Sequence, residues 1–189
     1  TNKRHFVFCY DPARTIDNST LLIGELFKDP QKGIMGRICN DINFADLGTR
    51  RKTPMRSPEQ VKEIRSLLLS YNGDAPEYGN VEFYMDGGAG GGGTIIPDFF
   101  MEDFYEEGHN NEPQYWHPGI IDPEYSKEYV NKFPNAKKIF HVLPPTVYKV
   151  PMYEALIQAV QNDLIIFTAD YDHHGYLNLM DVDEETLKQ

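Results

Sequence analysis

The sequence predicts a mixed α/β fold, with a sheet of three antiparallel strands followed by parallel strands and flanked by helices. Three strand-like apolar segments come first, separated only by the turn-rich segments DPARTIDN and KDPQKG. Such short separators are typical of consecutive antiparallel strands. Strand-like and helix-like segments then alternate, which is typical of parallel strands joined by helical crossovers.

The antiparallel strands are expected at residues 5–10 (HFVFCY), 19–27 (STLLIGELF) and 35–44 (MGRICNDINF). The first is apolar on both faces, which indicates a central strand buried on both sides. Its Cys9 is therefore expected to be a buried thiol.

The segment SPEQVKEIRSLLLSYNG is expected to form the first helix. Ser57 suits the N-cap, Pro58 the first helical position, and Gln60 the closing position of a capping box. Gly73 is the expected end of this helix.

The second half of the chain is expected to alternate strands and helices, with an irregular excursion at 109–135. That excursion is rich in proline and aromatic residues, and its Trp116 is expected to pin it to the core. The tail at 181–189 resembles the start of a helix. The remaining expected elements are a strand at 80–86, a helix at 94–108, a helical turn near SKEYVN, a strand at 136–142, a helix at 150–162 and a strand at 163–169.

Length and composition indicate one ordinary globular domain spanning residues 1–189. The chain is 40% hydrophobic and 25% charged, and no eighteen consecutive apolar residues suggest a membrane span. The start TNKRHFVF lacks an initiating Met, so the chain is interpreted as a fragment of a longer protein. The net charge of −11 argues against tight, autonomous DNA binding, although it does not exclude chemistry on DNA.

Two expected strands end in an aspartate, Asp11 in FVFCYD and Asp86 in FYMD. In a mixed sheet of this plan the first and fourth strands lie side by side and run parallel, so the two carboxylates meet at one edge. Hard oxygen ligands suit Mg²⁺ or Mn²⁺, and two such ions about 4 Å apart hydrolyse phosphodiesters. We therefore assign Asp11 as a bridging ligand and Asp86 as the second ligand.

The glycine-rich run after Asp86 allows a second interpretation. DGGAGGGGT contains G-x-G-x-x-G, a weak signal for nucleotide binding on its own. No G-K-[ST] follows, the run does not come after the first strand, and Asp86 would repel a pyrophosphate. We expect instead that Gly87, Gly88 and Gly90 let a ligand approach the backbone closely. A loop that binds nothing remains an alternative.

The layout is that of the ribonuclease H-like fold, and the chain resembles the C-terminal nuclease domain of the large terminase subunit of tailed bacteriophages. The resemblance spans nearly the whole chain in order: YDPARTIDNS, YNG, FYMDGGAGGGG with DFFMEDF after it, and YKVPMYEALIQAVQNDLIIF. It implies a divalent-metal-dependent endonuclease that cuts double-stranded viral DNA during genome packaging in the host cell cytoplasm. A separate N-terminal ATPase domain, the small terminase subunit and the portal are the implied partners.

The sequence departs from the family in its third acidic ligand. The family supplies this ligand from a histidine–aspartate–aspartate run on a helix beyond the last strand, and the sequence stops at Gln189 without such a run. We therefore expect an incomplete site that lacks this C-terminal helix. The segment TADYDHHGY is interpreted as a solvated turn, with Asp172 as the first alternative ligand.

Basic residues gather in the connector GTRRKTPMR, which holds Arg50, Arg51, Lys52 and Arg56. They are candidate phosphate contacts, with solvated loop charge as the alternative. Lys149 matches the family position of a lysine that would approach the scissile phosphate. A DNA-binding module of the same fold that does not cleave is the main alternative function.

Overall fold

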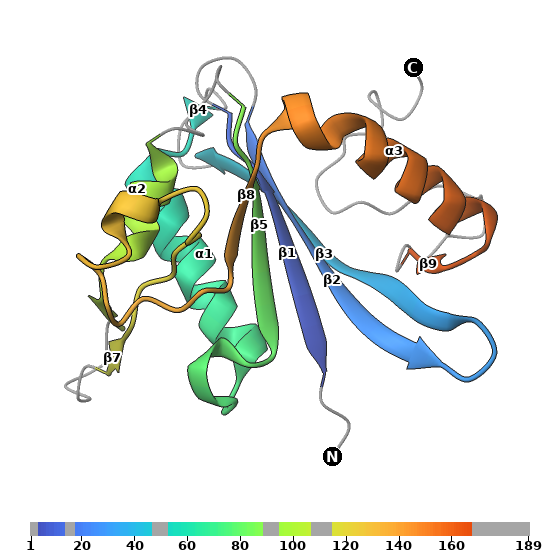
Figure 1. Ribbon diagram of the computed structural model, residues 1–189, viewed down its shortest axis with the longest axis horizontal. Coiled ribbons are helices and arrows are strands. Elements are labelled where there is room, and N and C mark those ends of the chain that lie inside the picture. The colour runs from blue at the N-terminus through green and yellow to red at the C-terminus, as the bar shows by residue number, and fades with distance from the viewer. Residues whose placement is uncertain (1–3, 14–17, 47–52, 89–94, 107–114, 168–189) are drawn as a thin grey trace.

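The computed structural model describes residues 4–13, 18–46, 53–88, 95–106 and 115–167. Its centre is a seven-stranded mixed sheet in the order β4-β3-β2-β1-β5-β8, with β9 paired to β3. Helices α1 and α2 lie on one side of this sheet and α3 lies on the other side (Figure 1). The predicted class, an α/β fold with antiparallel strands followed by parallel ones, is confirmed.

The antiparallel half consists of β1 (His5–Asp11), β2 (Ser19–Asp29), β3 (Gly33–Asp46) and the short β4 (Thr53–Pro54). The β2–β3 turn is stabilised by Asp29, whose Oδ1 accepts the backbone N–H groups of Gln31 and Lys32, each at 2.8 Å. These bonds hold the pKa of the Asp29 carboxyl below its usual value. Gly33 closes the turn at φ 86°, a conformation that glycine adopts without strain.

The parallel half begins with β5 (Val81–Asp86), which pairs with β1 from Phe6↔Val81 to Tyr10↔Met85. Strand β8 (Phe140–Leu143) pairs in parallel with β5. The expected adjacency of the first and fourth strands is therefore confirmed. The last strand, β9 (Ile165–Ile166), covers two of the five described residues of the strand expected at 163–169, and it pairs with β3.

Helix α1 (Ser57–Asn72) ends before Gly73 as expected, but its start differs from the prediction. Arg56 occupies the N-cap, so Ser57 is already helical. Gln60 does not close a capping box, because its side chain is buried and bonds Tyr10 and the Met55 carbonyl. A short 3-10 helix, η1 (Pro76–Tyr78), follows.

Helix α2 (Ile96–Met101) is shorter than the expected helix at 94–108. The chain instead forms β6 (Phe104–Tyr105), which pairs with β7 (Trp116–His117). Trp116 is half exposed, so its predicted role of pinning the excursion to the core is wrong. The expected helical turn is confirmed as η3 (Lys127–Tyr129).

Helix α3 (Pro145–Gln161) begins five residues earlier than expected, with Pro145 in its first turn and Pro151 inside it. Proline is well accommodated in a first helical turn because the N–H groups there have no helical partner. Lys149 therefore lies within α3 and not before it. No helix within the described part of the chain is long and apolar enough to cross a membrane.

The hydrophobic core lies between the sheet and the layer formed by α1 and α2. Alternate residues of each strand point into it, as the two-residue side-chain period of a strand requires. Its fully buried large side chains include Phe8, Leu21, Ile23, Phe44, Ile64, Leu68, Phe83, Met85, Phe100 and Phe140.

The opposite face of the sheet is partly open. Cys9, which was expected to be buried, is exposed. Its partner on β2, Leu22, and Leu26 further along β2 are more than a third exposed. None of the residues of α3 is buried. The expectation that β1 is covered on both faces is therefore wrong for the residues that the structure describes.

Candidate metal site

The two predicted acids lie at adjacent ends of neighbouring parallel strands. Asp11 is the last residue of β1 and Asp86 is the last residue of β5. The final paired residues of these strands are Tyr10 and Met85, so Asp11 and Asp86 come next in register. Neighbouring strands are about 4.8 Å apart, which brings the two backbone positions close together.

Both carboxylates belong to the same face of the sheet. Tyr10 and Met85 are buried in the core, on the side of α1. Since side chains alternate along a strand, Asp11 and Asp86 point to the other side, where α3 lies (Figure 1). Asp11 is exposed and Asp86 is partly buried, so the pair is open to solvent at the carboxyl end of the sheet.

The Asp86 carboxylate is restrained by the turn that follows it. Its Oδ1 accepts the backbone N–H of Gly88 at 2.8 Å. The backbone N–H of Gly87 donates to the Leu143 carbonyl at 3.1 Å, which ties the turn to the end of β8. These two bonds give Asp86 a defined direction at the sheet edge.

A Cβ at either of the first two glycines of this turn would crowd neighbouring side chains of the chain itself. A Cβ at Gly87 would lie 2.7 Å from Val142 Cγ1, and a Cβ at Gly88 would lie 3.2 Å from Asp86 Oδ1. The prediction attributed these glycines to close approach of a ligand, whereas the Gly87 position is occupied by β8. Gly90 lies outside the described residues.

Two aromatic side chains that the sequence interpretation missed adjoin the acid pair on the same face. Tyr84 precedes Asp86 by two residues and pairs with His141 of β8, and the two rings stack with centroids 4.7 Å apart. The Tyr84 hydroxyl donates to Glu82 at 2.8 Å. Burial and this carboxylate raise the pKa of Tyr84 to about 12. The two-residue strand period could have revealed Tyr84, whereas His141 required the β5–β8 register.

The ligand set is limited to these two acids within the described part of the chain. No group of three or more His, Cys, Asp or Glu side chains that could hold a metal occurs among those residues. Asp172, the alternative third ligand, lies outside them. Two carboxylates that face one side fit the hard-oxygen chemistry of one Mg²⁺ or Mn²⁺, and a second ion would need further oxygens.

The predicted DNA contacts are only partly described. Arg56 is exposed, and its Nε donates to Glu59 Oε1 at 3.1 Å. This interaction raises the pKa of Arg56 and lowers that of Glu59. Lys149 is exposed in the first turns of α3, which starts two residues after β8 ends at the same sheet edge. Arg50, Arg51 and Lys52 lie outside the described residues.

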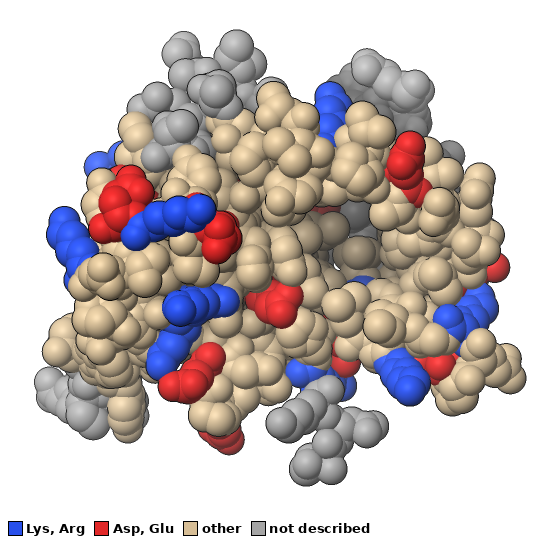
Figure 2. Space-filling view, in the orientation of Figure 1, with Lys and Arg blue, Asp and Glu red and all other residues tan. Residues whose placement is uncertain are grey.

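The visible charge distribution gives no broad basic surface. On the face shown in Figure 2, lysine and arginine side chains lie among aspartates and glutamates, without a wide area of one sign. A nucleic-acid track on this face would therefore depend on local cations and not on a general positive field.

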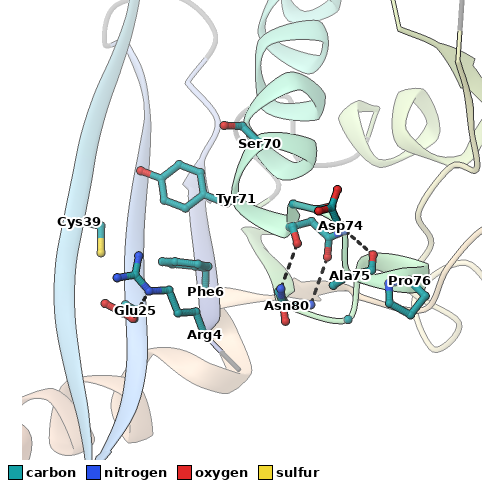
Figure 3. A pocket seen from close by; sticks show the side chains of 13 residues that line it. Arg4, Phe6, Glu25, Cys39, Ser70, Tyr71, Asp74, Ala75, Pro76 and Asn80 are labelled. Carbon is teal, nitrogen blue, oxygen red and sulfur yellow. Dashed lines mark hydrogen bonds and ion pairs between the residues drawn. The ribbon is translucent and has the colours of Figure 1, made fainter. Parts of the chain in front are cut away.

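A groove of about 940 Å³ lies at the opposite end of the sheet, between the end of α1 and strands β1–β3 (Figure 3). Phe6 and Tyr71 form its aromatic wall, with ring centroids 4.9 Å apart. Glu25 forms ion pairs with Arg4 at 3.5 Å and with Arg37 at 3.3 Å. The groove opens at the amino end of β1, whereas Asp11 lies at its carboxyl end, so the groove is not part of the acid site.

Comparisons with known proteins identify no relative. No protein-family model, curated protein or solved structure matches this chain. The function is therefore inferred from the chemistry of the site.

Proposed function

We propose that this chain is a divalent-metal-dependent nuclease that cuts double-stranded DNA, with Asp11 and Asp86 as the metal ligands. The observation that supports it is the pair of strand-end carboxylates, adjacent in register and on one face of the sheet. The wider proposal is the terminase role: cleavage of viral DNA during packaging in the host cytoplasm, alongside an ATPase domain, a small subunit and a portal.

The residues at the carboxyl end of the sheet would act together in this reaction. Asp11 and Asp86 supply the negative oxygens that hold the ion, and the Gly88 N–H keeps the Asp86 carboxylate in one direction. A divalent ion in such a site lowers the pKa of a bound water and stabilises charge on the leaving oxygen. Lys149 is exposed in the first turns of α3, which begins at this sheet edge, and we assign it to the DNA phosphates.

The same geometry weakens the alternative of nucleotide binding. A phosphate cradle needs free backbone N–H groups at the start of the turn. Here the Gly88 N–H is bonded to Asp86, and the Gly87 N–H is bonded to Leu143. The carboxylate also places negative charge where a pyrophosphate would lie.

The decisive experiment measures nicking of supercoiled DNA and Mn²⁺ binding for wild type, Asp11→Asn and Asp86→Asn. We expect Mn²⁺-dependent nicking in wild type, and loss of at least about a hundredfold in each variant with an unchanged melting temperature. Mn²⁺ should support more activity than Mg²⁺, because it binds a given oxygen site more tightly and Mg²⁺ demands near-ideal octahedral geometry.

Asp98→Asn is the matched control, because Asp98 is an exposed acid of α2, on the core side of the sheet. Wild-type cleavage by either site variant would refute the ligand assignment. DNA binding without cleavage at any metal concentration would favour the non-cleaving module.

A further inference from the structure

A buried set of polar side chains lies directly beneath Asp11, on the core side of the sheet. Tyr10 and Gln60 are each 2% exposed, and Ser19 is fully buried. Tyr10 precedes Asp11 in β1 and points to the opposite face. These three residues come from β1, β2 and α1, so they connect the elements that surround the proposed metal ligand.

Hydrogen bonds join Tyr10 to α1 and to the connector before it, and join Ser19 to the backbone just after Asp11. The Tyr10 hydroxyl donates to Gln60 Oε1, and Gln60 Nε2 donates to the Met55 carbonyl in the connector before α1. Ser19 Oγ accepts the backbone N–H of Ala13 at 2.9 Å and bonds the Ala13 carbonyl at 3.2 Å. Tyr10 and Ala13 enclose Asp11 and Pro12, so both ends of this short segment are fixed.

These bonds act on Asp11 through the backbone that carries it. Its side chain is exposed on the other face of the sheet, away from the buried set. Each of these hydrogen bonds adds only modest net stability, because it replaces bonds that the same groups make to water in the unfolded chain. What the hydroxyls of Tyr10 and Ser19 add is a defined geometry for the strand end.

We propose that Tyr10 and Ser19 are positioning residues that hold Asp11 in place for metal binding, with Gln60 joining them to α1. This inference rests on the proposed function, because it assigns the residues that support the same acid pair. Groups that orient metal ligands commonly affect metal affinity by tenfold or more when they are removed.

The test measures the Mn²⁺ dissociation constant by calorimetry for Tyr10→Phe and Ser19→Ala, at a temperature where all variants are folded. We expect each to weaken Mn²⁺ binding by about tenfold, and to lower kcat for DNA nicking while leaving KM for DNA unchanged. Hydrogen exchange at the Ala13 amide should be faster in Ser19→Ala, because this amide loses its hydrogen bond to Ser19 Oγ. This measurement tests the Ser19–Ala13 bond in the absence of metal.

Tyr78→Phe is the matched control. Tyr78 is also buried and donates its hydroxyl to a backbone carbonyl, that of Pro118, at 3.1 Å. It therefore loses a comparable hydrogen bond away from the acid pair and should bind Mn²⁺ like wild type. Equal weakening in Tyr78→Phe would mean that general loosening of the fold explains the effect, and the inference would be wrong.

The remaining outcomes separate this inference from the proposed function. Strong Mn²⁺ binding that is lost in Asp11→Asn but retained in Tyr10→Phe and Ser19→Ala overturns the inference alone. Mn²⁺ binding that is absent in wild type, or unchanged in Asp11→Asn, overturns the proposed function and this inference with it.

Discussion

Gly119 lies where two segments of backbone meet too closely for any side chain. A Cβ there would be 2.1 Å from the Met101 carbonyl oxygen, which is backbone and cannot rotate away. The Gly119 N–H also donates to Asp103 at 3.1 Å, just after α2 ends. This contact fixes the excursion after residue 115 against the end of α2.

Gly119→Ala should therefore destabilise the fold by about 3 kcal/mol or more, as overpacking of a backbone contact does. Urea unfolding measures the loss. Gly36→Ala is the control, because the nearest atom to its Cβ would be Leu26 Cδ2 at an ordinary 3.8 Å. A change of under about 1 kcal/mol in Gly119→Ala would show that the two segments separate readily.

A prediction for a single residue succeeded where neighbouring residues in the sequence determine its place, and failed where a distant residue does. Asp11 and Asp86 were placed correctly because the strand period and the strand ends are visible in a few consecutive residues. Gln60 was misassigned because its partner, Tyr10, is fifty residues away in sequence. A local capping pattern contains no information about such a partner.

At the scale of elements, the end of α2 shows why the sequence overestimated a helix. Arg65 of α1 donates to the carbonyls of Phe99 and Glu102, each at 2.8 Å, and so satisfies groups at the end of α2. Its guanidinium lies 4.3 Å from the centre of the Phe104 ring. The segment EDFYEEG has helical composition, but this tertiary contact ends the helix.

Helix α3 is unusual because its own apolar residues lie on most of its sides and are exposed. Val147, Val150, Leu156, Ile157 and Val160 are all about half exposed or more, and none of its residues is buried. Its polar residues Glu154, Gln158 and Gln161 share only a narrow side, so the periodic pattern that orients a helix on a sheet is weak. The sequence therefore predicted that the helix exists but could not predict where it packs.

Replacing Leu156 or Ile157 by Ser should lower the free energy of unfolding by only about 1 kcal/mol or less, because these side chains are about half exposed. Phe140→Ala, in the fully buried core, should cost about 3–5 kcal/mol. Urea denaturation of the purified chain makes the comparison. A loss of more than about 2 kcal/mol in Leu156→Ser would mean that α3 is covered in solution.

For the molecule as a whole, the order and direction of the strands could be predicted from the sequence. Which face of the sheet each helix covers could not. Short turns between the first three strands required antiparallel neighbours, and the later alternation required a parallel β5 beside β1. Which face each helix covers depends on side-chain packing across the whole chain. Cys9 was predicted to be buried on that basis, and it is exposed.

The fold should also lose stability at alkaline pH, because the buried Tyr10 and Tyr78 have raised pKa values. Burial, with a smaller contribution from the Asp11 charge, raises the pKa of Tyr10 to about 12. Burial likewise raises the pKa of Tyr78 to about 12, with Arg65 opposing and Asp103 adding to the shift. An unfolded tyrosine titrates near pH 10.

Between about pH 10 and pH 12 the unfolded chain has lost the tyrosine proton while the folded chain retains it. The unfolded state then binds fewer protons, so the free energy of unfolding falls as the pH rises. The stabilisation is fully present below pH 10, and each tyrosine contributes a slope of about 1.4 kcal/mol per pH unit in this window. Urea unfolding at pH 9, 10 and 11 should show the fall, and Tyr78→Phe should reduce its slope by about that amount. An identical slope in Tyr78→Phe would mean that this hydroxyl is hydrated in the folded state, and that other groups cause the alkaline loss.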